Sequence, residues 1–373
     1  MSEMKQRSLE EVKALGTEEA VEIMRQAGIV GAGGGGFPTY FKYKAPQQHL
    51  MVNATESEPG YWADKLVHKE HLEEFLQLFE AMKAIFGFEQ VSLCVHEKDR
   101  EWFADYAEHA GDLYDMRYAP NTYGMGEEKN LIKGVTDTKV PRFMDTPDGK
   151  RRPGLPLDAG IIMNNSETLL NVYRALFLGK PVTTKFLQVY GEETEIKVYD
   201  APIGASFAEI LRIAGIDVED SRHLAVVDGG PYLHEQGIDE LGTGDAYVKR
   251  TTNALFVLLK HKQGKEYADI ETDPPEEGIV PLVGNVSGAH VPLGGPVLTP
   301  AEPLVSEGDE VEYEQKIGEP VDEGFSVGVW ASVGGTISSV ENDLVAIAGG
   351  AIAQEEAETE AEAEAKGARP RPR

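Results

Sequence analysis

Five of the six residues from Gly31 to Gly36 are glycine, and this run constrains the fold more than any other segment. Glycine destabilises helices and strands, so we expect the run to form a loop. It follows Thr17–Ala27, whose apolar spacing predicts an amphipathic helix that stops at Gly28. Such a loop lets the backbone approach a flat or anionic ligand and offers N–H groups to phosphate oxygens. A flexible loop that binds nothing is the alternative, and the run alone does not decide between the two.

Apolar segments alternate with helical segments over the first half of the chain. We expect strands at 50–53, 91–95 and 159–163, and helices at 68–86 and 169–178. A strand followed repeatedly by a helix is typical of a layered fold with some parallel sheet. The sequence therefore predicts the α/β fold class, with α+β character where the later segments depart from this alternation.

The pattern changes after residue 182. Two alternating segments, a short helix and a further strand within about fifty residues suit a β-grasp unit, a sheet folded around one helix. Residues 279–349 are rich in Val and Gly and predict an all-β module, and the last residues alternate Glu and Ala. We therefore expect an α/β domain at 1–182, a β-grasp domain at 183–272, an all-β module at 279–349 and a disordered acidic tail at 354–373.

A second candidate binding loop, Asn53–Gly60, follows the first predicted strand. It holds Glu56 and Glu58 with one residue between them, before a Pro-Gly turn. Ligands in α/β folds bind at the carboxyl ends of strands, and carboxylates there accept hydrogen bonds from ribose hydroxyls. The alternative is a solvated acidic turn, which is common in a chain this acidic.

The charge balance excludes some classes of partner. The chain holds 64 Asp and Glu against 35 Lys and Arg, so its formal net charge is −29. A nucleic-acid binder needs a basic surface, and an anionic membrane repels an acidic protein. We therefore expect neither nucleic acid nor a membrane surface as a partner. Adaptation to salt or a need for solubility explains the charge equally well.

Cysteine content and targeting signals indicate which covalent links, clusters and cellular compartment the chain can have. The single cysteine, Cys94, excludes a disulfide within the chain and an iron–sulfur cluster held by four of its own cysteines. No run of 18 apolar residues predicts a transmembrane helix, and the N-terminus lacks the apolar stretch of a signal peptide. We therefore expect a cytoplasmic protein.

Four motifs in order carry a specific resemblance. They are GAGGGGFPT, NATESEPG, YGMGEEKNLIKG and NNSETLLNV. Their order and spacing resemble the flavin-binding subunit of respiratory NADH dehydrogenase (the 51-kDa type), the C subunit of the Rnf complex and the cobalamin reductase of propanediol microcompartments. The resemblance covers about residues 17–348. It implies an FMN domain, then a soluble-ligand-binding β-grasp (SLBB) domain, then a barrel-sandwich hybrid module placed last, as in the cobalamin reductase.

The resemblance implies roles for particular residues. Hydride would pass directly from NAD(P)H to FMN, so it implies no catalytic side chain. Phe37 would offer a face to nicotinamide or adenine, and Lys42 would stabilise reduced flavin or hold phosphate. Glu56 and Glu58 would lie beside FMN and NADH. The other residues that match the family's cofactor pocket are Gly31, Gly33, Gly34, Gly36, Asn53, Gly126, Glu127, Glu128, Asn164, Asn165 and Thr168.

Two departures from the family bear on electron transfer. The family's members normally ligate iron–sulfur clusters after the SLBB domain, whereas this chain has only Cys94, in a predicted strand, which we interpret as a buried core thiol. The segment 144–153 also differs from the one that helps hold NADH in respiratory members. It contains Lys150, Arg151 and Arg152, which would bind a dinucleotide phosphate or an acidic partner, or simply form an exposed loop.

Two other features predict no additional chemistry. A lipoyl- or biotin-carrying module needs a lysine at a hairpin tip, and the matching stretch 326–335 has none. The module is therefore expected to be structural or a docking surface. The nine histidines show no ligand spacing except His68 and His71, which could share a helix face but lack a third ligand. We expect them to be structural and expect no metal site.

The sequence therefore favours an FMN-dependent, NAD(P)H dehydrogenase-like electron-transfer protein. FMN is the expected cofactor, NAD(P)H the expected substrate, and the acceptor a partner protein or a corrinoid such as cobalamin. The resemblance also implies that the chain belongs to an oligomer or a larger complex, in the cytoplasm or within a bacterial microcompartment. The alternative is a non-catalytic assembly subunit of a redox complex, which the missing cluster ligands favour and the retained glycine and acid loops oppose.

Overall fold

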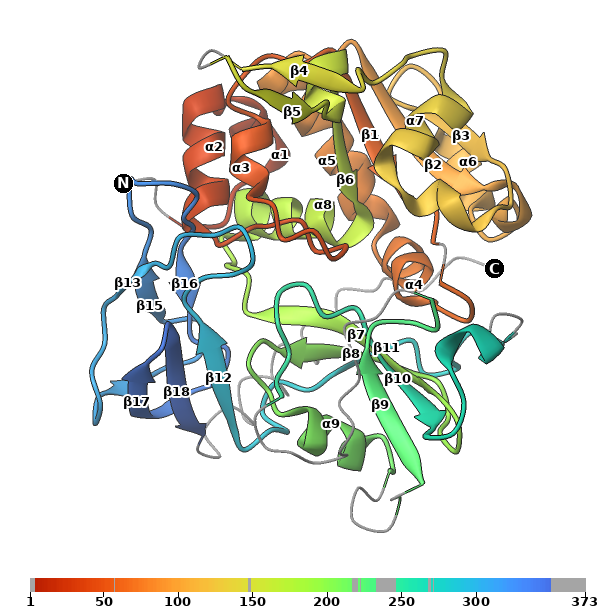
Figure 1. The fold of residues 1–373 in the computed structure, drawn as a ribbon. Coiled ribbons are helices and arrows are strands. Elements are labelled where there is room, and N and C mark those ends of the chain that lie inside the picture. Colours follow the sequence, from red (N-terminus) through yellow and green to blue (C-terminus); the bar gives the residue numbers. More distant parts are fainter. Residues whose placement is uncertain are drawn as a thin grey trace, which may run out of the picture.

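A four-stranded parallel sheet forms the centre of the first part of the chain. The computed structural model describes residues 4–56, 58–146, 149–216, 221, 223–232, 246–267, 270 and 272–349, so the expected tail at 354–373 lies outside it. The strand order is β3-β2-β1-β6, and every neighbouring pair is parallel. The predicted α/β class is confirmed (Figure 1). The strands are β1 (His49–Asn53), β2 (Gln90–His96), β3 (Asp115–Ala119) and β6 (Ile161–Asn165).

Alternation along these strands sends apolar side chains to both faces of the sheet. Leu50 and Val52 of β1 join the large core beneath the helices, whereas Met51 joins a smaller cluster that includes Cys94. Both faces are covered, as expected for a parallel sheet with near-continuous apolar strands. Cys94 is buried there, and burial raises the pKa of its thiol, so the sulfur is a core group. The helices of this part are α1 (Leu9–Lys13), α2 (Thr17–Gln26), α3 (Thr39–Lys42), α4 (Ala63–Glu70), α5 (Leu72–Phe86), α6 (Ala104–His109), α7 (Glu128–Val135) and α8 (Ser166–Tyr173).

Two predicted helices differ from the structure at their ends. The helix expected at 68–86 is two helices, because His71 has a non-helical backbone and its side chain bonds Glu74 in the first turn of α5. The helix expected from residue 169 begins at Ser166, where the Asn165 side chain accepts from the Thr168 N–H. Its last turn is the π-helical segment η4 (Arg174–Leu178). In both cases local backbone or side-chain geometry decided the boundary rather than apolar spacing.

The second sheet has the β-grasp arrangement that the sequence predicts. Strands β7 (Thr184–Gly191) and β8 (Lys197–Pro202) form a hairpin, and helix α9 (Phe207–Ile213) follows. Strand β10 (Ala254–Leu259) then pairs parallel to β7 and antiparallel to β9 (Leu224–Asp228). Strand β11 (Ile279–Pro281), expected to open the C-terminal module, instead adds to this sheet beside β8.

The C-terminal part consists of two small antiparallel sheets that share one core with the β-grasp sheet. Leu187 and Val189 of β7 lie in the same buried cluster as Val291 and Ile317. Trp330 donates from its indole to the Gln26 carbonyl at 2.8 Å, so this part also anchors the end of α2 (Figure 1). The first sheet is β12 (Gly288–Pro292), β14 (Glu310–Val311), β17 (Gly335–Glu341) and β18 (Leu344–Gly349), and the second is β13 (Glu302–Pro303), β15 (Lys316–Glu319) and β16 (Val329–Trp330).

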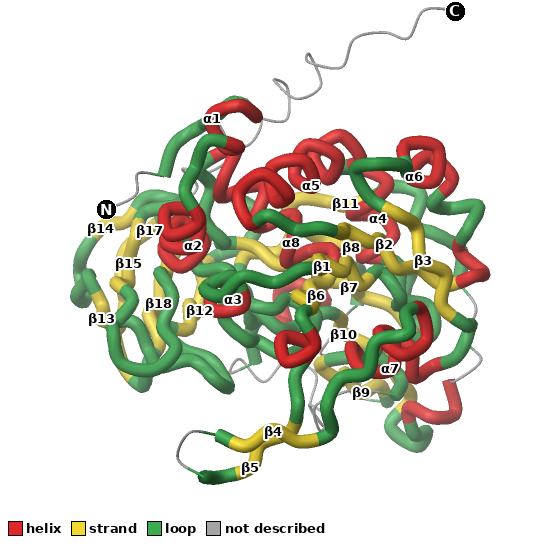
Figure 2. The backbone as a smooth tube through the Cα atoms, turned by 90° about the horizontal axis from the view of Figure 1, so that it is seen from above, coloured by secondary structure: helices red, strands yellow, loops and turns green. Residues whose placement is uncertain are grey.

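A separate hairpin contains the basic residues of segment 144–153, which differs from the matching segment of the respiratory family members. Strands β4 (Phe143–Asp145) and β5 (Arg151–Pro153) pair antiparallel, and Figure 2 shows the hairpin standing out from the remainder of the chain. Arg151 lies 3.4 Å from Asp145, and Arg152 lies 2.7 Å from Asp158. Two of the three cations therefore already face carboxylates. No helix in the described part of the chain has the length and apolar character needed to cross a bilayer.

Candidate functional site

The carboxyl ends of β1 and β6 open onto a cavity of about 570 Å³, here called the strand-end cavity. Asn53 and Asn165 are register partners at these ends, so their side chains share one face of the sheet. The opposite wall comes from the β-grasp part, through Asp228–Gly230 and Thr251–Ala254. The predicted site residues that line this cavity are Gly33, Gly34, Asn53, Glu56, Glu58, Gly126, Glu127 and Asn165.

The glycine run forms a closed loop against the start of α8. Gly31 donates to the Phe37 carbonyl at 2.8 Å, and Ala32 donates to the Thr168 hydroxyl at 3.0 Å. A Cβ on Gly33 would lie 3.3 Å from the Asn165 amide nitrogen, and Gly34 has φ +106°. A side chain at Gly33 would therefore be in tight contact with the Asn165 amide, and the positive φ of Gly34 favours glycine at the next position. Thr168 is buried and holds the loop instead of lining the cavity.

The acid loop, Glu56–Gly60, is held at both ends. Asn53 accepts from Thr55 and donates to the Gly126 carbonyl at 3.0 Å, which ties the loop to η2 (Tyr123–Gly126). At the other end the Gly60 carbonyl accepts from Gln188 of β7 at 2.7 Å. The loop therefore bridges the parallel sheet and the β-grasp sheet. Its position depends on both sheets, so neither alone determines where the carboxylates lie.

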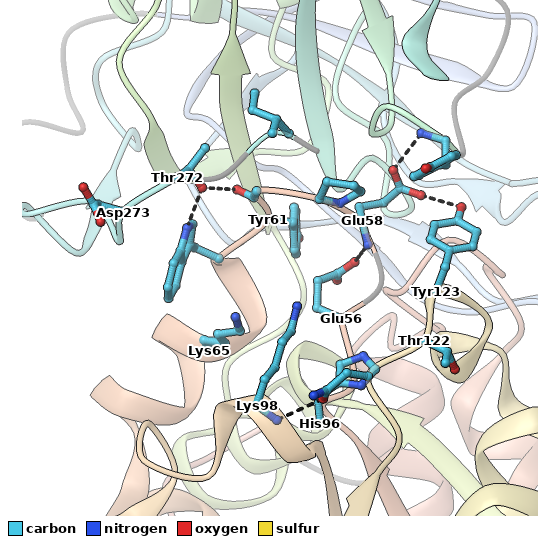
Figure 3. A pocket seen from close by; sticks show the side chains of 16 residues that line it. Glu56, Glu58, Tyr61, Lys65, His96, Lys98, Thr122, Tyr123, Thr272 and Asp273 are labelled. Atoms are coloured by element: carbon cyan, nitrogen blue, oxygen red, sulfur yellow. Dashed lines mark hydrogen bonds between the residues drawn. The ribbon is translucent and has the colours of Figure 1, made fainter. Parts of the chain in front are cut away.

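The two carboxylates of the acid loop are oriented by their partners. Glu56 accepts from the Glu58 N–H at 2.7 Å, and Glu58 accepts from the Tyr123 hydroxyl at 2.8 Å and the Tyr232 N–H at 2.9 Å (Figure 3). Burial and the Glu58 carboxylate raise the pKa of Tyr123, so its hydroxyl stays protonated as the donor. A Cβ on Gly230 would meet the Glu58 carboxylate at 2.3 Å, so the β-grasp backbone also confines this side chain.

A second cavity, the acid-loop cavity, lies on the other side of the same loop. It encloses about 760 Å³ and shares Glu56, Glu58 and Tyr123 with the strand-end cavity. Figure 3 shows Lys65, Lys98 and His96 on its far wall. Sequence reasoning missed these side chains because they come from α4, the end of β2 and the 3-10 turn η1 (Glu97–Asp99) that follows it, where no motif marks them. The available signal was the position of His96 at the carboxyl end of a predicted strand, where binding residues of α/β folds lie.

Seven of the predicted residues do not line the strand-end cavity: Gly31, Gly36, Phe37, Lys42, Glu128, Asn164 and Thr168. The Phe37 ring makes edge contacts with Phe41 and Phe325 at 5.8 and 5.2 Å between centroids, inside an aromatic cluster. Lys42 donates to the Met163 carbonyl and lies 3.7 Å from Glu128, and burial lowers its pKa. Asn164 donates to the Tyr43 hydroxyl on the opposite face of β6 from Asn165.

Other predicted site residues make contacts that stabilise the glycine loop or cap a helix. Gly31 closes the glycine loop, and Gly36 turns with φ +59° against Thr251, away from the strand-end cavity. Glu127 lines the cavity and also caps α7 by accepting from the Asn130 N–H at 3.0 Å. Among the described residues no group of His, Cys, Asp or Glu is placed to hold a metal ion. His68 is buried, bonds Ser166 at 3.0 Å and has a pKa lowered to about 3 by burial.

A buried charge cluster supports the cavity wall. Lys185 of β7 contacts Glu167 at the start of α8, and both side chains are almost fully buried. Asp64 of α4 lines the strand-end cavity next to this pair. Burial raises the pKa of Asp64 to about 7; the Lys185 charge opposes this rise and the Glu167 charge adds to it.

This raised pKa makes a prediction for stability against pH. Between about pH 4 and 7 folded Asp64 binds more protons than the unfolded residue, so its contribution to stability falls as pH rises through this range. Asp64→Asn should flatten that fall, measured as the free energy of unfolding in urea at pH 5, 6, 7 and 8. Asp105→Asn, on exposed α6, is the control. If the free energy of unfolding of Asp64→Asn depends on pH as that of the wild type does, the raised pKa of Asp64 would be refuted.

Two segments of the chain match known protein families. Residues 24–174 match the family profile described as the Nuo51 FMN-binding domain, and residues 270–355 match the RnfC barrel sandwich hybrid domain. The chain is 29% identical over 247 residues to the cobalamin reductase PduS of Salmonella typhimurium, covering 66% of this chain and 51% of that protein. It is 32% identical over 219 residues to the C subunit of the ion-translocating oxidoreductase complex of Pseudomonas aeruginosa, covering 57% of this chain and 27% of that protein.

The fold has a counterpart among solved structures. A chain of an NAD+-reducing [NiFe]-hydrogenase in the H2-reduced state superposes with a TM-score of 0.51 at 19% identity, covering 69% of this chain and 50% of that one. The present chain spans about half the length of PduS and about a quarter of the Pseudomonas protein. It thus combines a segment like the Nuo51 FMN-binding domain with a segment like the RnfC barrel sandwich hybrid domain, which confirms the resemblance predicted from the sequence.

Proposed function

We propose that this chain is an FMN-dependent electron-transfer flavoprotein that takes electrons from NAD(P)H and passes them to a partner protein or a corrinoid. The observation that carries the proposal is the convergence of the glycine loop, Asn53, Asn165 and the acid loop on one cavity. These segments are distant in the sequence, and packing a core does not require them to meet. Similarity to PduS and to the C subunit of an ion-translocating oxidoreductase complex supports the electron-transfer assignment.

The residues of the strand-end cavity fit FMN. The volume of about 570 Å³ lies within the usual range for small-molecule sites. Gly33 and Gly34 line the cavity without a Cβ, so a phosphate could approach the backbone of the glycine loop closely there. The Asn53 and Asn165 amides suit the polar edge of a flavin ring. When bound, the flavin would supply the hydride-accepting chemistry, and this chain's residues would bind and orient it.

The charge of the side chains that line the cavity would affect the midpoint potential of a bound flavin. The described charged side chains that line it are all acidic: Glu56, Glu58, Asp64, Glu127 and Asp228. Lys42, the cation implied by the resemblance, is turned towards Met163 and Glu128 instead. Carboxylates beside a flavin disfavour its anionic reduced form, so the lining predicts a lowered midpoint potential. A neutral reduced flavin, protonated with help from Asp64, would avoid this repulsion.

The direct test is an anaerobic visible spectrum of the full chain reconstituted with FMN, before and after NADH or NADPH. Bound flavin that is bleached supports the dehydrogenase half-reaction. Bound flavin that stays oxidised would refute NAD(P)H as the donor and indicate a partner protein as the electron source. Failure to bind flavin would overturn the proposal and favour the non-catalytic assembly role.

The acid loop should govern the nucleotide more than the flavin. Glu56 and Glu58 face both cavities, so carboxylate hydrogen bonds to a ribose would be lost in the double variant Glu56→Gln and Glu58→Gln. Each charged hydrogen bond contributes about 1.5–3 kcal/mol, so KM for NAD(P)H should rise about tenfold or more while the Kd for FMN stays nearly constant. Glu108→Gln, on exposed α6, is the matched control. An unchanged KM would contradict this role.

A further inference from the structure

A third cavity of about 480 Å³, the junction cavity, lies where the three parts of the chain meet. The first part contributes Gly36, whose Cβ position would be 3.2 Å from the Thr251 methyl and 3.8 Å from Pro296. The β-grasp part contributes Lys249–Thr251, and the C-terminal part contributes Pro292 and the Asn342–Leu344 turn. Neither the candidate flavin pocket nor the acid loop extends into it, apart from the shared Thr251.

Arg250 is the buried charge of this cavity. It lies in a turn closed by the Thr252 N–H on the Lys249 carbonyl at 3.1 Å, and the residue is only 7% exposed. One terminal nitrogen donates to the Pro292 carbonyl at 3.2 Å, whereas Nε is buried without a hydrogen-bond partner. No carboxylate of the described residues forms an ion pair with this guanidinium. Burial lowers its pKa to about 10, so it remains charged at neutral pH.

A buried cation with one carbonyl partner is unfavourable. The guanidinium has five N–H donors, and a buried charge without a counter-charge costs several kcal/mol. Neighbouring groups do not supply the missing charge: Lys249 is a second cation, 3.6 Å from Asp228, and Asp343 lies at an exposed position at the mouth. An anion that enters the cavity would satisfy the free donors, and a phosphate matches the planar fork of arginine.

We propose that the junction cavity is an anion site in which Arg250 binds a phosphate group, either as inorganic phosphate or as the phosphate of a larger ligand. The Gly36 turn leaves room for that group, and Thr251 also lines the cavity. A bound phosphate would contact the glycine loop, the β-grasp part and the C-terminal part at once, because all three line the cavity. The site would therefore couple anion binding to the stability of this junction.

The test is thermal unfolding of the full chain with inorganic phosphate from 0 to about 20 mM, at constant ionic strength adjusted with chloride. Because a ligand of the folded state stabilises it by mass action, the Tm of wild type should rise with phosphate and not with chloride. Arg250→Met should lose the response and be at least as stable as wild type without phosphate, since it removes an uncompensated charge. Arg212→Met, exposed on α9, should keep the response.

A second variant keeps the guanidinium and tests the site if Arg250→Met fails to fold. Asp343→Asn removes the carboxylate at the mouth, so the Kd for phosphate should fall about threefold. A wild-type Tm that ignores phosphate would overturn the proposal. So would an Arg250→Met protein that is destabilised yet still responds, because Arg250 would then act only as a clamp on the Pro292 carbonyl.

The source of the phosphate is separated by comparing FMN with riboflavin. If the flavin phosphate occupies the site, Arg250→Met should weaken FMN binding at least tenfold and leave riboflavin binding unchanged. If free phosphate occupies it, both flavins should bind the variant as they bind wild type, while the thermal response to phosphate is lost. The phosphate titration does not require flavin binding, so failure of the proposed function and failure of this site are distinguishable.

Discussion

Gly33→Val should weaken FMN binding at least a hundredfold and leave the fold intact. A Cβ at this position already lies 3.3 Å from the Asn165 amide, and the two methyl groups of valine would project into the same space. Gly33 lies on an exposed part of the loop and outside the core, so the free energy of unfolding should change little. A hundredfold change corresponds to about 2.7 kcal/mol of binding free energy. Fluorescence titration of FMN into the full chain measures it.

Gly35→Ala is the matched control for this experiment. Nothing lies within 4 Å of a Cβ at Gly35, its φ is not in the left-handed region and it does not line the strand-end cavity. The variant should therefore bind FMN within about twofold of wild type. Equal affinity of Gly33→Val and Gly35→Ala would mean that flavin does not pass close to Gly33, and the placement of FMN against the loop would be wrong.

Lys185→Met should destabilise the fold by about 3–5 kcal/mol, the largest effect we expect on stability. The variant leaves Glu167 as a buried carboxylate without its cation, close to Asp64, and breaking a buried ion pair on one side has this cost. The loss should be greater at pH 8 than at pH 5. Burial raises the pKa of both carboxyls, so at low pH protonation removes the uncompensated charges.

The double variant Lys185→Met with Glu167→Gln separates charge from packing. It removes the buried carboxylate along with the ammonium, so it should recover much of the stability that the single variant loses. Urea unfolding of both variants at pH 5 and 8 measures the difference. If the double variant is as unstable as the single one, the loss comes from packing at Lys185, and the electrostatic account of this cluster fails.

The local pattern of apolar and polar residues was enough to predict much of the fold. The apolar runs of β1, β2 and β6 and the alternation of the β7–β8 hairpin were identified from sequence, because burial on one or both faces imposes those patterns. Helix boundaries were harder to recognise: the non-helical backbone at His71 divides one expected helix, and the Asn165 cap begins another three residues early. Strand β11 was misplaced because which sheet a short strand joins depends on partners distant in the sequence.

The candidate site was predicted only as a set of loops. Motif order indicated the glycine loop, the acid loop and the asparagine pair, yet not which side chains face the cavity. Asn164 and Asn165 are adjacent, and the two-residue period of β6 sends them to opposite faces. Phe37 matches a family position, but here Phe325 from the C-terminal part packs against its ring. The β-grasp wall at Asp228–Gly230 and Thr251–Ala254 was not assigned to the site at all.

The sequence by itself determined the glycine loop, the parallel strands, the shortage of cysteine and the acidic balance, because each is a property of residue type or short-range spacing. Tertiary structure alone decided that Asp64, Glu167 and Lys185 meet beside the cavity and that Arg250 is buried without a carboxylate among the described residues. Burial and counter-charge depend on packing between segments that lie far apart in the sequence. The chemistry of the site therefore follows from distances that no local pattern encodes.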